Sequence, residues 1–146
     1  MGILSRLTSL RGSQDDERPP KPEDEQREEK IERDVYRVTV EYRNGDTETF
    51  DTYGRYNTGS HKITYNVELQ PKTKNYSDPG DAAYTYDRRR IHWGVLARDP
   101  VEERVGTETW RLTWIVTYQE KTKFGEFVRW EPHAENPELE RIEPAD

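Results

Sequence analysis

The sequence contains no cysteine, and only 30% of its residues are apolar. The lack of cysteine excludes disulfide bonds, thiolate metal sites and cysteine nucleophiles. No apolar run approaches the roughly 20 residues that cross a bilayer. The N-terminus also lacks the continuous apolar stretch and small-residue cleavage site of a classical secretory signal. We therefore expect a protein that is neither transmembrane nor exported by such a signal.

Signals for catalysis and metal binding are equally scarce. The three histidines, His61, His92 and His133, are far apart, and no pair has the spacing of metal ligands. No serine lies in a nucleophile elbow, and no glycine-rich phosphate loop precedes a helix. We expect a protein that is not an enzyme and that holds no metal or other cofactor.

Charge is abundant but unevenly distributed. Residues 1–34 carry ten acids and seven bases, residues 132–146 carry five acids and one base, and residues 35–131 are balanced at fifteen each. DNA- and RNA-binding domains usually carry a basic excess that neutralises phosphates. Nucleic acid is therefore disfavoured as a partner. The distribution predicts a folded body over 35–131 between a charged flexible linker, 12–34, and an acidic C-terminal tail, 132–146.

The first eleven residues have apolar side chains at helical spacing, which predicts a short amphipathic docking helix over 1–11. Burying four such side chains contributes at most ~6–12 kcal/mol, whereas ordering about ten residues costs on the order of 10–20 kcal/mol. This helix needs a partner surface, either a protein or, less favoured because acids follow from Asp15, a membrane surface. The predicted partner-docking residues are Ile3, Leu4, Leu7 and Leu10.

From residue 35 onward, apolar residues alternate with polar ones, which is typical of half-buried strands. Asn44-Gly45 predicts a two-residue hairpin loop that pairs Thr39 with Phe50. We interpret the large aromatic residues of these segments as core, rather than as a platform that stacks on sugars or bases, because large side chains supply most of the buried surface in a small domain. They are Trp93, Trp110, Trp114, Trp130, Tyr65 and Tyr118. The prediction is an all-β fold with about six antiparallel strands in a small sandwich or partly open barrel. These strands span approximately 36–42, 46–53, 63–69, 91–97, 110–118 and 127–130.

The segment 71–90 lacks periodicity and is predicted to be a long loop. It combines aromatic and basic side chains, which suit an anionic ligand or an acidic protein surface. The competing interpretation is an ordinary solvated loop whose arginines pair with nearby acids. The residues predicted for an anion or partner contact are Tyr84, Tyr86, Arg88, Arg89 and Arg90.

The stretch 35–53, VYRVTVEYRNGDTETFDTY, resembles the opening hairpin of small uncharacterised β proteins from haloarchaea and their tailed viruses. Arginine outnumbers lysine sixteen to seven beside an acid excess, which suits a salt-adapted or GC-rich source. The resemblance implies a viral or proviral protein that is part of the particle. It implies no active-site residues.

Two hypotheses follow. The first is a non-enzymatic structural or adaptor protein, such as a minor capsid or tail component, that binds a protein partner or a homo-oligomeric assembly through its N-terminal arm. The second is a binding module in which the 71–90 loop engages an anionic ligand, including nucleic acid. The expected location is the virion or the cytoplasm.

Overall fold

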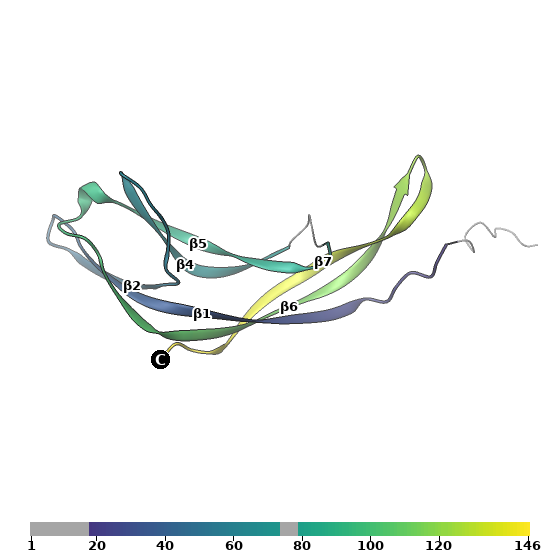
Figure 1. The fold of residues 1–146 in the computed structure, drawn as a ribbon, viewed down its shortest axis with the longest axis horizontal. Helices are drawn as coiled ribbons and strands as arrows, with labels where there is room; N and C mark the ends of the chain where they lie inside the picture. The colour runs from purple at the N-terminus through teal and green to yellow at the C-terminus, as the bar shows by residue number, and fades with distance from the viewer. Residues whose placement is uncertain (1–17, 74–78) are drawn as a thin grey trace, which may run out of the picture.

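The computed structural model describes residues 18–73 and 79–146, which form two antiparallel sheets (Figure 1). Strands β2, β1, β6 and β7 make the long sheet in that order, and β3, β4 and β5 make the small sheet. The predicted all-β antiparallel fold is confirmed, with seven strands. The strands are β1 (Glu25–Glu41), β2 (Thr47–Thr52), β3 (Arg55–Thr58), β4 (Lys62–Thr73), β5 (Ala82–His92), β6 (Val101–Lys123) and β7 (Glu126–Glu143).

The molecule is elongated and bowed. The small sheet lies over part of the long sheet on its concave side, and the β6–β7 hairpin extends beyond it at one end (Figure 1). Two clusters of buried side chains fill the space between the sheets. One gathers around Leu112, Trp114 and Val116 of β6, and the other gathers around Val38 of β1 and Tyr65 of β4.

The β1–β2 hairpin differs from the prediction by one residue of register. Val38, not Thr39, lies opposite Phe50. The loop has three residues, because the Gly45 amide donates to the Tyr42 carbonyl (2.9 Å) and the Tyr42 amide donates to the Asp46 carbonyl (2.8 Å). Gly45 has a φ of 94°, the left-handed conformation that closes three-residue loops. The two-residue loop would have required Asn44 to adopt a positive φ as well.

The predicted flexible segments are strands over much of their length. β1 begins at Glu25, inside the predicted linker, and β7 runs to Glu143 through the predicted acidic tail. Both pair with β6 along these extensions. Ile31 is the one apolar residue of the extension 25–34, and it is buried against the β6 core, so a single apolar side chain anchors this charged part of β1. Beyond β7, the carbonyl of Ala145 lies against Gly106, where a β-carbon would not fit.

Two predicted loops are also strands. β4 continues to Thr73 and β5 starts at Ala82, so most of the segment 71–90 is a hairpin rather than a long loop. β6 starts at Val101, although the sequence indicated a loop to about Gly106. Of the fourth predicted strand, 91–97, residues 91 and 92 belong to β5, and the chain then forms a 3-10 turn, η2 (Trp93–Val95). The predicted helix over 1–11 lies outside the described residues.

Candidate interaction site

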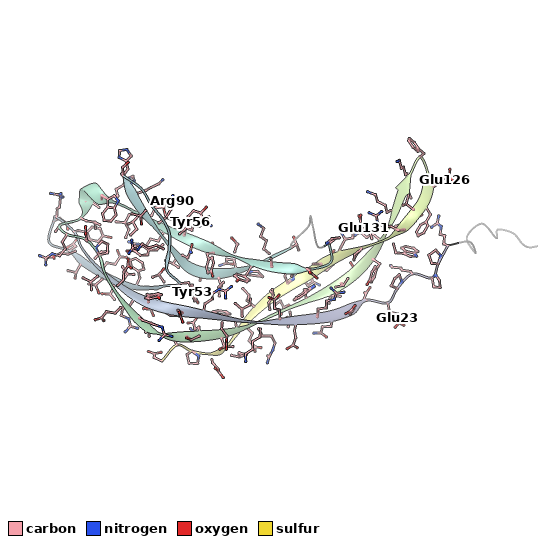
Figure 2. All side chains as sticks on the ribbon, in the orientation of Figure 1. Glu23, Tyr53, Tyr56, Arg90, Glu126 and Glu131 are labelled. Atoms are coloured by element: carbon pink, nitrogen blue, oxygen red, sulfur yellow. The ribbon has the colours of Figure 1, made fainter. Side chains whose placement is uncertain are left out.

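The β6–β7 hairpin closes in a tight turn at the projecting end of the molecule. Lys123 of β6 pairs with Glu126 of β7, which leaves only Phe124 and Gly125 in the loop. Their φ angles are 53° and 79°. Both therefore lie in the left-handed region that the two central residues of a type I′ hairpin turn require. Figure 2 shows Glu126 at this tip. Asn-Gly adopts these two positive φ angles far more readily than Phe-Gly does.

Phe124 combines backbone strain with exposure. A bulky residue at positive φ costs of order 1–3 kcal/mol, and such strain clusters at functional sites. Its side chain is 91% exposed, so burial recovers none of that cost. The Lys123 ammonium lies 5.7 Å from the centroid of the Phe124 ring. Val128 on β7 adds a second exposed apolar side chain to the hairpin.

Aromatic contacts stiffen the hairpin behind its tip. The rings of Phe127 and Trp130 meet edge to face at 5.2 Å. The entering chain packs beside them, because the Trp130 indole donates to the Pro19 carbonyl (2.9 Å) and the Arg18 guanidinium lies 5.2 Å from the Phe127 ring. Arg18 also pairs with Glu120 of β6 at 2.7 Å. The chain therefore enters the described structure alongside the hairpin that carries Phe124.

The four predicted docking residues, Ile3, Leu4, Leu7 and Leu10, lie outside the described residues. In the sequence they precede Arg18, the first described residue, which lies beside the hairpin that carries Phe124.

The structure separates the predicted cluster of tyrosines and arginines onto two faces of β5. Tyr84, Tyr86 and Arg89 point toward the long sheet. The Arg33 guanidinium lies 5.0 Å from the Tyr84 ring and donates to the Tyr86 hydroxyl (3.1 Å). Arg88 and Arg90 are exposed on the other face. Arg88 and Arg90 are therefore the most exposed residues of the predicted set.

Arg89 belongs to one of three similar groups, which we call the carboxylate triads. In each, a glutamate accepts a hydrogen bond from a tyrosine hydroxyl and pairs with an arginine. Glu48 is held by Tyr42 (2.7 Å) and Arg89. The other two triads are Glu102 with Tyr65 and Arg55, and Glu108 with Tyr53 and Arg141. No local sequence pattern indicated them, because their members come from distant parts of the chain; Tyr53 and Glu108, for example, lie 55 residues apart.

The triads join strands and sheets. Glu108 is buried on β6, where Trp110 also donates to it (2.7 Å), and Arg141 reaches it from β7 at 3.1 Å. Burial and then the hydrogen bond to Glu108 raise the pKa of Tyr53. Burial and then Glu102 raise the pKa of Tyr65. The hydrogen bond to Glu48 and then burial raise the pKa of Tyr42. These hydroxyls stay protonated at neutral pH and serve as donors.

A hollow of about 640 Å³ lies beside β7 and is lined in part by titratable side chains. Its lining includes Arg129, Glu131 and His133. The Glu131 carboxylate pairs with Arg129 (3.2 Å) and lies 3.6 Å from the His133 imidazole. Within 18–73 and 79–146, no group of three metal-ligating side chains comes together.

Comparison with known proteins yields no relative. No family model, no curated protein and no solved structure matches the chain. The part of the chain that the structure describes contains no helix long and apolar enough to cross a membrane.

Proposed function

We propose that the protein is a non-enzymatic structural or adaptor protein that attaches to a protein assembly through the end carrying the β6–β7 hairpin. The observation that carries this proposal is Phe124, a strained aromatic residue with 91% of its side chain exposed. Strain of this kind is retained where the residue serves a function. An exposed aromatic side chain at a tip is well suited to fill a pocket on a protein partner.

The N-terminal arm supplies the second part of the attachment. Ile3, Leu4, Leu7 and Leu10 form the apolar side of the helix predicted over 1–11. Arg18 lies beside the hairpin, so the arm and Phe124 reach the same partner without any change in the body. Two weak contacts on one partner bind far more tightly than either alone, because the second contact forms at high effective concentration.

The chemistry of the polar groups supports a role without catalysis. In the carboxylate triads each glutamate is bound by an arginine and a tyrosine. Because the pKa values of these tyrosines are raised, their hydroxyls stay protonated at neutral pH and are poor nucleophiles. Their placement between strands and sheets suits cross-linking of the fold. The resemblance of residues 35–53 to proteins of haloarchaea and their tailed viruses suggests a capsid or tail as the assembly.

The test is the mass of the native complex. Tagged full-length chain, purified from its natural source, is expected in a complex with stoichiometric partner when weighed by native mass spectrometry. Phe124→Asn and the double variant Leu7→Asp/Leu10→Asp should each return the chain largely free. Val101→Asn is the matched control, because Val101 is 56% exposed and lies in the other half of the molecule, opposite Thr39. Recovery of the wild type as free chain, or normal complexes from both docking variants, would refute the proposal.

A further inference from the structure

The outer face of the small sheet carries a row of basic side chains. Arg88, Arg90 and His92 alternate along β5 and therefore lie on one side of the sheet, and Lys62 of β4 lies opposite His92. The Arg88 guanidinium lies 3.7 Å from the centroid of the Tyr56 ring. Figure 2 shows Tyr56 and Arg90 close together on this sheet. We call Lys62, Arg88, Arg90 and His92 the basic face.

The cations of this face are available to a partner. Lys62, Arg88 and Arg90 are exposed. Arg89, the inward neighbour, pairs with Glu48. The carboxylates of the described residues form ion pairs within 4.0 Å with many arginines, but with none of these three cations. The three charges are therefore not neutralised within the described structure.

The outer face of the long sheet carries the opposite charge. Its register aligns three cross-strand rows over β1, β6 and β7. Arg111 lies in the middle row, between Glu28 (3.6 Å) and Glu140 (2.9 Å), and the side chains of both glutamates are 69% exposed. The face has five acids and two bases. The rows are Glu28–Thr113–Glu138, Lys30–Arg111–Glu140 and Glu32–Thr109–Glu143, which we call the acidic face.

The partition of charge extends to the whole chain. Residues 53–100, which include the small sheet, carry eight bases and five acids, a net charge of +3. The remaining residues carry a net charge of −10. The small sheet and the C-terminal end of β7 lie on opposite sides of the long sheet (Figure 1). The basic face of one molecule therefore cannot reach its own acidic face.

We propose that the basic face binds a second copy of this chain, on its acidic face. Both faces are built on strands, so their charged side chains repeat at the same spacing, roughly 6.6–6.8 Å for every two residues. Because the two faces differ, the contact is head to tail. Repetition of such a contact produces an open row or a closed ring of copies.

The contact should be weak between free molecules and strongly dependent on salt. Exposed ion pairs each contribute little, and salt screens them. Copies held side by side on an assembly would meet at millimolar effective concentration, which is enough for weak contacts to form. The inference does not depend on the docking end, and its test uses the free full-length chain.

The test is sedimentation velocity over a range of protein concentrations, at about 20 mM and about 300 mM salt. For the wild type, the sedimentation coefficient should rise with concentration at low salt and stay constant at high salt. Arg88→Glu/Arg90→Glu and Glu138→Lys/Glu140→Lys should each abolish the rise. An equimolar mixture of these two variants should restore it, because one then has two acidic faces and the other two basic faces. Lys121→Glu/Lys123→Glu, on the hairpin, is the charge-matched control and should behave like the wild type.

Two results would overturn the proposal. One is a wild type that sediments independently of concentration at low salt. The other is a variant mixture that fails to associate although both variants have the wild-type circular dichroism spectrum. A single-stranded oligonucleotide serves as a competing probe. If the wild type binds it, Arg88→Glu/Arg90→Glu does not, and the wild type fails to self-associate, the basic face belongs to nucleic acid instead.

Discussion

The backbone strain at Phe124 allows stability to be measured separately from the proposed docking. Its φ of 53° is a conformation that asparagine adopts readily and phenylalanine does not. We expect Phe124→Asn to raise the free energy of unfolding by about 1 kcal/mol. For a domain of this size, the melting temperature should rise by ~3–5 °C. Thermal unfolding followed by circular dichroism measures the shift.

The opposite result would be equally clear. Lower stability in Phe124→Asn would mean that the ring supports the hairpin, and the argument from strain would fail. Phe127→Ala serves as the comparison, because Phe127 contacts Trp130 and Arg18 and its loss should be destabilising. The sequence predicted strands over 110–118 and 127–130, and therefore a turn between them. It could not place Phe124 at positive φ, because that depends on the pairing of Lys123 with Glu126.

At the scale of single elements, β1 illustrates how a highly charged segment forms a strand. Residues 25–34 have acids and bases at helical spacing and one apolar residue, Ile31, so local reasoning predicted a linker. The strand forms because β6 offers a long pairing edge and because Arg27 and Arg33 reach the small sheet, at Asp81 (3.0 Å) and Tyr86 (3.1 Å). Such distant partners leave no local trace in the sequence. The alternating segments, in contrast, reveal their buried face directly.

Ile31→Ala should therefore behave as a core substitution. Ile31 is 3% exposed, and truncation of a buried isoleucine costs about 2–4 kcal/mol. Lys30→Ala, one residue away on the exposed face, should change the free energy of unfolding by less than ~0.5 kcal/mol. Urea denaturation followed by tryptophan fluorescence compares the two. Equal, small effects would indicate that this part of the chain acts as a linker.

Exposure divides the predicted site residues of β5 into two groups. Arg88 and Arg90 are exposed, whereas Arg89, Tyr84 and Tyr86 face the interior. In an uninterrupted strand Tyr86 and Arg88 would share a face, but the register shift between Asn66 and Glu68 breaks the alternation of β5 at Asp87 and Arg88. The interpretation of 71–90 as a loop concealed this division. Trp114 is buried as predicted, while Trp93 lies in η2 and donates its indole hydrogen to the Gly59 carbonyl (2.8 Å). Whether any of these residues binds a partner stays a prediction.

At the scale of the whole molecule, the triads predict the response to alkaline pH. The pKa values of Tyr42, Tyr53 and Tyr65 are raised above the ordinary value near 10. The unfolded chain therefore loses these protons before the folded chain does. The stabilisation is complete below about pH 10 and falls as the pH rises further. Urea midpoints measured from neutral pH to pH 11 should decline above pH 10.

The double variant Tyr53→Phe/Tyr65→Phe isolates this effect. It should be less stable than the wild type at neutral pH, because Glu108 and Glu102 each lose a donor. Above about pH 10 its urea midpoint should decline less steeply, because two linked protons are gone. Parallel declines of the variant and the wild type would show that the triads do not govern the alkaline limb.

The 23 residues of β6 give the protein a mechanical property. At 3.2–3.4 Å per residue, a strand of this length spans up to roughly 75 Å, and β6 has a hydrogen-bonded neighbour on each side. A load applied at the hairpin tip, along the strand, would act in shear on many backbone hydrogen bonds at once. The molecule would then behave as a stiff rod. In the proposed attachment it would hold its β1–β2 end at a fixed distance from the partner surface that binds Phe124.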